Sequence, residues 1–596
     1  MLQKVIKETE FKSYFRRVFF LSLVFHALAA WFSAGFHHYD EHFQLLEFAA
    51  QKAGIVAENT LPWEFKAEIR PSLQPWIAFS VIRFLQFLNL HDPFLAAIIL
   101  RIFAAIIGWF SSLILTLTFL QYFKSDHYKK IFIAISALLW FSVYLHIRFS
   151  SESLSTSFFW LGISVLLFQT QKSSKNTFRF LLSGILLGIA VVLRTQIILM
   201  AAGAFLWMLL LGKYTWKQLS ALLFGGVLAV LFGAWLDYLF YGHWANTAYN
   251  YFTVNILQDK TSQFGVSAWY YYFWAFLRFA QAPMSYLLLP LIVWSWIKFP
   301  KSIITWTCLA FIIPHIFIGH KEFRFIFPLI PAIPVLISLL HQYYLQKQQS
   351  IFFKGDIWRN WFKIIVIVVT IQNFIMLIFY ILQPLQPLIK PLQIVYNDSD
   401  PKKEGFLLAD EYFYGNDRGF LFDSEMRYFM QPKTRIIRFR ELQEVQNITD
   451  TCSAQVYILL GSNNLKTFTD NKPYVRNAKV IWQNHPFFPQ DLKIEGKGTY
   501  TDVNTTTSIK GRGNSTWGYA KKPYRLKLDS KTSIFGLPKA KNWVLLANYL
   551  DPTLMLNSVA LKAGQLLSIP YTNSFVPVDV SINGKYMGCY LFTEQV

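Results

Sequence analysis

Long apolar runs separated by basic connectors restrict this chain to a small set of folds. The runs continue to about residue 382, and several approach the ~20 residues that a helix needs to cross a bilayer. The chain is also 54% hydrophobic and only 15% charged, well outside the range of ordinary soluble domains. We therefore predict a polytopic α-helical membrane protein. We place eleven spans near residues 18–34, 94–122, 131–147, 153–169, 180–194, 195–212, 218–238, 279–297, 302–319, 324–345 and 364–382.

The positions of Lys and Arg orient these spans. Lys and Arg number 56 against 34 Asp and Glu, a balance that in a soluble chain would suggest nucleic acid. Here the cations cluster between the apolar runs, as expected of cytosolic connectors, and anionic lipid is the better partner. With eleven spans, all of these basic segments lie on the cytosolic side of the membrane, provided that the polar-edged stretch 76–90 is re-entrant or interfacial. The basic segments are 1–17, 124–130, 172–179, 213–217, 298–301 and 347–363.

Ionisable residues gather directly after the first span, on the opposite side. The stretch contains Asp40, Glu41 and Glu47, and the same loop continues to Glu64 and Arg70. A charged cluster at a membrane edge must be solvated, paired or functional. Helical spacing from Glu41 onward predicts a helix lying along the membrane surface. Asp40 then has two compatible roles, as the N-cap of that helix or as a catalytic group.

The same side of the membrane carries two further polar features. His320, Lys321 and Glu322 join two apolar runs, either as a solvated turn with a local ion pair or as a cation set that holds a lipid phosphate. Arg148 and Arg194 lie at the outer ends of their spans, where they either snorkel to the interface or bind a ligand. All candidate chemistry therefore shares one face.

After residue 382 the composition becomes that of a soluble α+β region. Residues 578–582 and 586–592 alternate with period two around Asn583-Gly584, which predicts a hairpin. Asp551-Pro552 predicts the start of a helix over 553–567. Cys452 and Cys589 are candidates for a disulfide outside the cytosol.

The charged stretches match a known family. The first, from His38-Tyr39-Asp40-Glu41 to Ile69-Arg70, resembles the first lumenal loop of the polyprenyl-phosphate-dependent mannosyltransferases that assemble GPI anchors and the N-glycan precursor. His320-Lys321-Glu322-Phe323-Arg324-Phe325 resembles their second signature. A middle-loop pattern is also present, in Asp237, Tyr241-Gly242, Trp244, Asn250 and Asn255. His42-Phe43 departs from the family's usual aromatic pair, which bears on acceptor choice.

This resemblance, over about residues 18–345, implies a GT-C fold and a membrane mannosyltransferase. It implies a polyprenyl-phosphate sugar donor, a glycan or glycolipid acceptor, and inversion at the anomeric carbon. Asp40 would be the base, and Glu41 would position the acceptor or hold Asp40 ionised. Cationic side chains would neutralise the departing phosphate, so that no metal or cofactor is required. The implied substrate-binding residues are His38, Gln44, Glu64, Arg70, Arg148, His320, Lys321, Glu322 and Arg324.

A second resemblance covers about residues 490–596. Ile509-Lys510-Gly511-Arg512-Gly513-Asn514-Ser515-Thr516-Trp517 and Lys521-Lys522-Pro523-Tyr524-Arg525 resemble the opening of CotH-type atypical kinases. Those kinases place their metal-binding acids in a later segment that this chain lacks, so we expect a β-rich module that transfers no phosphate. The expected regions are a cytosolic N-terminus (1–17), a GT-C domain (18–383) with a catalytic outer loop (36–92), an extracytosolic linker or soluble region (384–489) and a partial CotH-like domain (490–596).

Two other function classes stay open: a polytopic transporter with an outer sensor domain, and a CotH-like kinase or surface protein tethered by a membrane domain. A transporter is expected to carry polar groups at mid-membrane, whereas these runs keep theirs at one edge. The leading hypothesis is a multi-pass mannosyltransferase of the bacterial inner membrane or endoplasmic reticulum with a non-cytosolic C-terminus.

Overall fold

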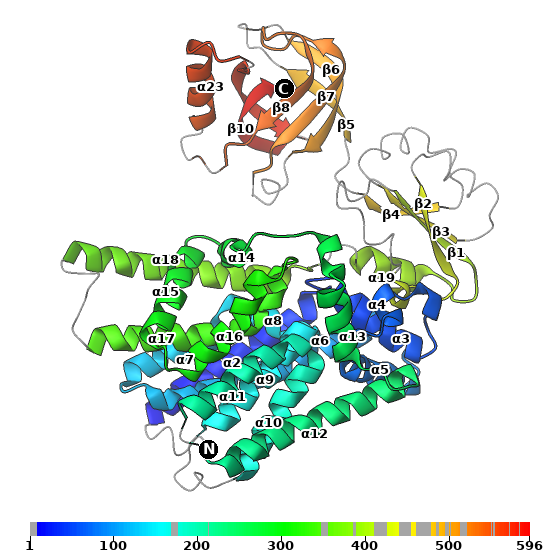
Figure 1. Ribbon diagram of the computed structural model, residues 1–596. Helices are drawn as coiled ribbons and strands as arrows, with labels where there is room; N and C mark the ends of the chain where they lie inside the picture. The colour runs from blue at the N-terminus through cyan, green and yellow to red at the C-terminus, as the bar shows by residue number, and fades with distance from the viewer. Residues whose placement is uncertain are drawn as a thin grey trace. The chain divides into compact units, whose positions relative to one another are not determined.

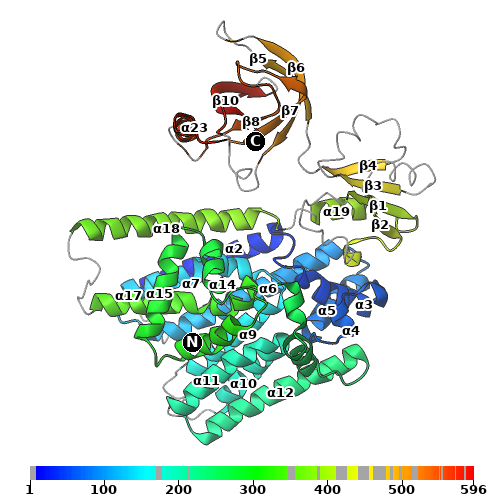
Figure 2. The same ribbon diagram turned by 45° about the horizontal axis from the view of Figure 1, so that its top comes forward.

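The chain divides into two compact units. The first comprises Met1–Gln393 with Met426–Pro432, and the second comprises Ile394–Glu425 with Lys433–Val596. Figures 1 and 2 show the helices of the first and the strands of the second. The computed structural model describes residues 9–168, 177–212, 214–346, 356–385, 389–410, 426–439, 455–460, 478–483, 488–494, 500, 502–512, 521–549, 551, 555–570, 572–582 and 585–595.

The first unit is helical throughout its described part. Its N-terminal half contains α2 (Thr9–Phe32), the π-helix η1 (His42–Glu47), α3 (Phe48–Lys52), η2 (Glu58–Thr60), α4 (Trp63–Lys66), α5 (Leu73–Phe87), α6 (Pro93–Phe119), η3 (Leu120–Tyr122), α7 (Asp126–Leu138), α8 (Trp140–His146), α9 (Ser151–Leu167), α10 (Thr177–Leu193), η4 (Thr195–Ile197) and α11 (Ile198–Leu210). The rest contains α12 (Trp216–Tyr241), α13 (Thr247–Phe252), η5 (Thr253–Leu257), η6 (Lys260–Phe264), α14 (Tyr271–Ala280), α15 (Met284–Lys298), α16 (Ile303–Phe317), η7 (Phe323–Leu329), α17 (Ala332–Gln346), α18 (Asp356–Leu382) and η8 (Arg427–Phe429). The helix α19 (Ile389–Asp398) runs across the boundary between the units.

Helices occur in every predicted apolar run, but not all are long enough to span by themselves. Among the described residues, four helices have the length and hydropathy of a membrane span, and up to seven spans result if each bent helix pair counts as one. The pair α7 and α8 bends by 44° at residue 139, for example. The prediction of several apolar membrane helices is confirmed, while the count of eleven stays a prediction.

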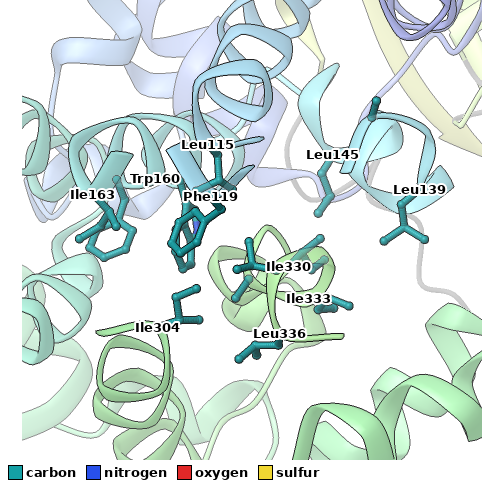
Figure 3. Packing of buried hydrophobic residues seen from close by; sticks show 14 of the residues in the cluster. Leu115, Phe119, Leu139, Leu145, Trp160, Ile163, Ile304, Ile330, Ile333 and Leu336 are labelled. Atoms are coloured by element: carbon teal, nitrogen blue, oxygen red, sulfur yellow. The ribbon is translucent and has the colours of Figure 1, made fainter. Parts of the chain in front are cut away.

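The core of the first unit is built from apolar side chains of many helices. Figure 3 shows Leu115 and Phe119 of α6, Trp160 of α9 and Ile304 of α16. Close to them lie Ile330, just before α17, and Leu336 of α17. Trp160 is fully buried, and its indole Nε1 donates to Pro328 O at 2.8 Å. In lipid, helices associate through such close packing and hydrogen bonds rather than through a hydrophobic driving force.

Small residues let α10 and α12 approach closely, and Figures 1 and 2 show the two helices side by side. A Cβ built on Gly225 would lie 2.2 Å from Leu181 O, and one on Gly184 would lie 2.0 Å from Leu222 O. Backbone therefore meets backbone at this crossing, as in membrane helix pairs with small residues at i and i+4.

This close approach predicts different effects for two adjacent glycines. Gly225→Ala should destabilise the protein by about 1–3 kcal/mol, because the new methyl group overlaps a backbone oxygen that cannot rotate away. Gly226→Ala is the control, since its Cβ would lie 3.7 Å from the nearest atom, Gly184 O. Thermal unfolding of both variants in detergent measures the difference. Equal midpoints for the two would show that the helices are not in contact here.

The described part of the second unit contains two sheets. The first is parallel, with strand order β2-β1-β3-β4 in β1 (Gly405–Asp410), β2 (Thr434–Phe439), β3 (Gln455–Leu460) and β4 (Ala478–Gln483). The second is antiparallel, with order β5-β6-β7-β8-β10-β9 in β5 (Phe488–Ile494), β6 (Val503–Gly511), β7 (Tyr524–Thr532), β8 (Ala540–Leu546), β9 (Phe575–Ile582) and β10 (Lys585–Glu594). Trp543, Tyr590 and Phe592 lie in its buried cluster.

Local predictions for this unit are confirmed where the structure describes them. Strands β9 and β10 pair as the predicted hairpin, although its turn, Asn583-Gly584, lies outside the described residues. The predicted helix is α23 (Leu556–Leu566), which begins later than expected. Asp551 still contacts its first residue, since Asp551 Oδ2 accepts from Leu556 N at 2.7 Å. Cys452 also lies outside the described residues, but Cys589 is a free cysteine, so the predicted disulfide was wrong.

Candidate active site

The loop after α2 is fixed by two charged side chains. Glu41 Oε1 accepts from the backbone N–H groups of His37 at 2.9 Å and His38 at 3.2 Å, closing the loop on itself. Arg148 holds the start of the loop, since its Nη1 donates to Ser33 O at 3.1 Å. Burial raises the pKa of Glu41 to about 7. The backbone around Asp40 is therefore positioned before any ligand arrives.

The helix predicted after Glu41 exists, and its polar side chains are buried rather than exposed; its location at the membrane surface stays a prediction. It is formed by η1 and α3, and the side chains of His42, Gln44 and Glu47 are buried inside the first unit. Burial of these polar groups is compensated by pairing: His42 Nε2 lies 2.7 Å from Glu47 Oε1, which also accepts from Tyr428 N at 2.9 Å. Sequence periodicity alone could not distinguish a helix covered by lipid headgroups from one covered by protein.

Arg324 joins three carboxylates from distant parts of the chain. Its Nη2 donates to Asp40 Oδ2 at 2.7 Å, its Nε to Glu322 Oε2 at 2.5 Å and its Nη1 to Glu152 Oε1 at 3.2 Å. Glu152 also accepts from Arg194 Nη1 at 2.5 Å. The side chains of Arg324 and Glu152 are only 8% and 3% exposed. A guanidinium suits this position because its donors form a planar fork.

The surroundings of Asp40 affect its pKa in opposite directions. Its Oδ1 lies 3.3 Å from His38 Nδ1, and its Oδ2 lies 3.7 Å from Arg70 Nη2. Burial raises the pKa of Asp40, but Arg324, His38 and Arg70 lower it by more, so that the pKa lies well below its usual range. The helix that follows begins without a side-chain cap. Asp40 therefore contacts two guanidinium groups and an imidazole, and the N-cap interpretation is not supported.

Arg70 connects Asp40 to a second acidic group. Its Nη2 also lies 4.0 Å from Glu64 Oε1, which accepts from Gln44 Nε2 at 3.2 Å. Burial raises the pKa of Glu64. The guanidinium of Arg70 lies over the ring of Tyr251, 5.8 Å from its centroid. The structure thus brings Gln44, Glu64 and Arg70, three of the candidates from the sequence, together beside Asp40.

Residues of the middle loop hold the backbone on both sides of Arg70. Tyr241 Oη donates to Arg70 O at 2.8 Å, and Asn250 Nδ2 donates to Glu68 O at 3.3 Å. Asp237 Oδ1 accepts from both the N–H and the hydroxyl of Ser72, each at 2.7 Å. The middle-loop pattern found in the sequence therefore fixes the position of a cation at the site.

The three residues before η7 differ in their roles. His320 Nε2 lies 3.0 Å from Glu322 Oε1, and this hydrogen bond raises the pKa of His320. Burial raises the pKa of Glu322, but His320 and Arg324 lower it by more and hold it well below its usual range. Lys321 instead donates to two carbonyl oxygens, Ser267 O at 2.9 Å and Ile318 O at 2.5 Å. Among the described residues, Lys321 and Arg148 donate to loop oxygens and form no ion pair with the carboxylates of this cluster.

A small polar cavity of about 40 Å³ lies beside this cluster. Three carboxyl groups, Asp40, Glu41 and Glu152, and two guanidinium groups, Arg70 and Arg194, contribute to its wall. It is lined by Asp40, Glu41, Gln44, Leu45, Ile69, Arg70, Pro71, Gln74, Ser151, Glu152, Leu193, Arg194, Thr195, Gln196 and Tyr251. Among the described residues, no set of three or more His, Cys, Asp and Glu side chains is arranged to hold a metal ion.

Sequence reasoning missed two residues of the site. In the sequence Glu152 is only one member of an outer loop, yet in the structure it shares Arg324 with Asp40. Gln74 is not conspicuous in the sequence either, yet it is 2% exposed and lines the cavity. The sequence feature that could have indicated Glu152 is its position as an acid in a serine-rich stretch at the start of an apolar run. Gln74 gave none, because a single amide in a half-polar helix is unremarkable in sequence.

Comparisons with known proteins identify relatives of both parts. Residues 17–394 match the Alg9-like mannosyltransferase family, and residues 509–596 match the CotH kinase protein family. GPI alpha-1,2-mannosyltransferase 3 of Bos taurus is 25% identical, over 49% of this chain and 52% of that protein. GPI mannosyltransferase 3 of Candida albicans is 26% identical, over 55% of this chain and 64% of that protein. The chain thus spans about half to two thirds of the length of these relatives.

A third relative matches over a shorter region, and the solved structures are more distant. The probable Dol-P-Man:Man(7)GlcNAc(2)-PP-Dol alpha-1,6-mannosyltransferase of Schizosaccharomyces pombe is 34% identical, over 25% of this chain and 27% of that protein. ArnT from Cupriavidus metallidurans bound to undecaprenyl phosphate gives a TM-score of 0.42 at 11% identity, covering 72% of this chain and 85% of that one. Since the family match covers residues 17–394, well over half of its length, the chain belongs to the Alg9-like mannosyltransferase family.

Proposed function

We propose that this protein is a membrane mannosyltransferase of GT-C type. It transfers mannose from a polyprenyl-phosphate donor to a glycan or glycolipid acceptor on the non-cytosolic face, with inversion at the anomeric carbon. The observation that carries the proposal is the position of Asp40, at a polar cavity and between Arg324 and Arg70. An acid that can accept a proton and cations that can accept a phosphate therefore lie within one site. The family match supports this function over a transporter.

The proposed reaction uses Asp40 as the general base. Asp40 takes the proton of an acceptor hydroxyl, and the hydroxyl oxygen forms a bond to the anomeric carbon. The bond between that carbon and the phosphate oxygen breaks, and the lipid phosphate leaves with the electron pair. Arg324, Arg70 and His320 neutralise the phosphate by charge-assisted hydrogen bonds. This chemistry asks for no metal and no cofactor.

The donor itself is proposed to activate the base. Without donor, Arg324 and Arg70 keep the pKa of Asp40 low, which makes the carboxylate a weak proton acceptor. A phosphate that draws these two guanidinium groups toward itself removes part of that stabilisation. Asp40 then becomes more basic only when the donor is bound, which limits unproductive proton transfer in its absence.

The remaining predicted residues are proposed to position the site. Glu41 and Arg148 fix the loop that carries Asp40, and Lys321 fixes the loop that carries His320. His38 orients Asp40 and Glu322, which it approaches at 3.3 Å on both sides. Gln44 and Glu64 orient Arg70. Glu322 holds both His320 and Arg324.

A transfer assay tests the proposed function. Membranes containing the protein are supplied with radiolabelled polyprenyl-phosphate mannose and extracted lipid acceptors, and label in the glycolipid fraction is measured. We expect label above that of membranes without the protein. If the protein transfers no mannose from this donor to any extracted glycolipid, the proposed function is wrong.

The proposed orientation predicts which positions a membrane-impermeant thiol reagent reaches. With the native cysteines replaced, a cysteine at position 58 or 320 should be labelled in sealed membranes whose non-cytosolic face is outside, because both positions lie on the predicted non-cytosolic side. A cysteine at position 129, in the basic connector 124–130, should be labelled only after the membrane is opened. Labelling of 129 but not of 58 and 320 in sealed membranes would reverse the proposed arrangement.

The region boundaries stay a proposal as well. We propose a cytosolic segment 1–17, a membrane glycosyltransferase domain 18–383, a soluble extracytosolic region 384–489 and a CotH-like module 490–596, in a multi-pass protein of the bacterial inner membrane or endoplasmic reticulum. The described strands of the last region and its match over 509–596 support a folded β-rich module there.

A further inference from the structure

We propose that Gln74 and Arg194 form a recognition subsite for the acceptor sugar, an assignment that rests on the proposed function. Gln74 lies in the first turn of α5 and is 2% exposed, and neither its Oε1 nor its Nε2 has a hydrogen-bond partner in the described part of the chain. A buried amide without partners costs about 1–3 kcal/mol, so it persists where function requires it.

Arg194 offers unused donors to the same cavity. Its Nη1 is engaged by Glu152, but its Nε and Nη2 are buried and without partners among the described residues. Arg194 is 6% exposed and, like Gln74, lines the cavity that Asp40 reaches. The cavity therefore presents an amide carbonyl, an amide N–H₂ group and guanidinium N–H groups that no described protein group satisfies.

Charge and chemistry favour a neutral polyol in this cavity over a phosphate. Three carboxyl groups, Asp40, Glu41 and Glu152, line it together with two guanidinium groups, Arg70 and Arg194, so the lining has no excess of positive charge to attract a phosphate. A phosphate only accepts hydrogen bonds from protein donors and would leave the carbonyl of Gln74 unpaired. A sugar hydroxyl both donates and accepts, so sugar hydroxyls can pair with both the carbonyl oxygen and the N–H₂ group of an amide.

The size of the cavity indicates which part of the acceptor enters. About 40 Å³ holds two or three oxygen-sized groups but not a pyranose ring. We infer that one edge of the acceptor sugar enters, with one or two hydroxyls on Gln74 and Arg194. This contact would direct the neighbouring hydroxyl toward Asp40 and select which position of the acceptor is mannosylated.

The test measures binding, so that it does not depend on turnover. Purified full-length protein in detergent is titrated with octyl α-D-mannopyranoside, a neutral pyranose, and separately with undecaprenyl phosphate. Gln74→Met should weaken mannoside binding about tenfold, the loss expected for removed hydrogen bonds to a buried hydroxyl, and leave phosphate binding unchanged. Gln86→Met, in the last turn of the same helix, is the matched control and should change neither.

A second readout separates recognition from folding. Methionine has nearly the same shape as glutamine and removes an unpaired amide, so the thermal midpoint of Gln74→Met should equal or exceed that of the wild type. Among the four monodeoxy octyl mannosides, at least one should bind the wild type about tenfold more weakly than octyl mannoside does. Gln74→Met should bind that same deoxy compound as tightly as it binds octyl mannoside.

Three results would overturn the subsite: no mannoside binding by the wild type, equal mannoside binding by Gln74→Met, or loss of phosphate binding instead. The last would show that the cavity takes the donor phosphate. Failure of the proposed function is a separate outcome, in which Gln74 controls mannoside binding but the wild type transfers no mannose in the membrane assay.

Discussion

Asp40→Asn is expected to reduce mannosyl transfer by about 10² to 10⁴ while the protein still folds. A positioned general base typically contributes this factor to a rate, and asparagine cannot accept the acceptor's proton. Its side-chain oxygen can still accept from Arg324 Nη2, which lies 2.7 Å from Asp40 Oδ2 in the wild type. Arg324 also keeps Glu152 and Glu322 as partners, so no buried charge is left without compensation. We expect a stability loss of only about 1–2 kcal/mol.

Glu58→Gln is the matched control for this substitution. It also converts a carboxylate to an amide on the outer loop, but Glu58 is exposed in η2 and does not line the cavity. Transfer from radiolabelled polyprenyl-phosphate mannose is measured in membranes with matched protein levels. The control should retain wild-type activity. Turnover by Asp40→Asn within tenfold of wild type would exclude Asp40 as the base.

The sequence predicted the local elements of this protein better than their surroundings. Apolar runs and basic connectors predicted the membrane helices, and period-two alternation predicted the hairpin of β9 and β10. The parallel sheet of β1 to β4 was not predicted, because short apolar runs in a parallel sheet lack alternation and its pairings join segments far apart in the chain. Burial of η1 was missed for a similar reason, since its cover comes from distant residues such as Tyr428.

The same distinction between local and long-range information applies to the residues of the candidate site. Asp40, Arg70 and Arg324 were found because charges at a membrane edge are uncommon and match a family signature. Glu152 was missed because its role depends on Arg324, 172 residues later in the chain. The roles of Lys321 and Arg148 also depend on geometry. The sequence does not indicate whether a basic side chain will bind a phosphate or donate to a carbonyl oxygen. In the structure, both side chains donate to carbonyl oxygens.

Arg324→Gln is expected to have the second large effect, on both stability and donor use. Arg324 contacts Asp40, Glu152 and Glu322 while only 8% exposed. Removing one partner of a buried ionic cluster typically costs about 3–5 kcal/mol. The loss should lie toward the lower end, because Glu152 keeps Arg194 and Glu322 keeps His320. The remaining folded protein should transfer mannose at least about 10²-fold more slowly, since a cation that stabilises the leaving phosphate is gone.

Arg324→Lys separates charge from geometry. Lysine restores one positive charge but not the planar fork that reaches three carboxylates at once. It should recover most of the stability lost in Arg324→Gln, and only part of the activity. The measurements are the thermal midpoint in detergent and the apparent KM for the polyprenyl-phosphate donor. Full recovery of both by lysine would show that Arg324 acts only as a point charge.

The pH dependence gives the sharpest distinction between a structural and a chemical role for Arg324. In the wild type without donor, the pKa of Asp40 is held well below its usual range, so Asp40 stays ionised as pH falls from about 8 to about 5 and its protonation should not slow transfer measured at low donor concentration. This lowered pKa contributes stability above the unfolded pKa of about 4, and the contribution is lost as pH falls toward the folded pKa. Without Arg324, the largest influence that lowers the pKa of Asp40 is gone, so this pKa rises. Protonation of Glu41, whose pKa is about 7, affects both proteins alike, so transfer by Arg324→Gln, relative to its own maximum, should show an additional decline on acidification that the wild type lacks. An acidic limb in the same place for both proteins would show that Arg324 does not control the ionisation of Asp40.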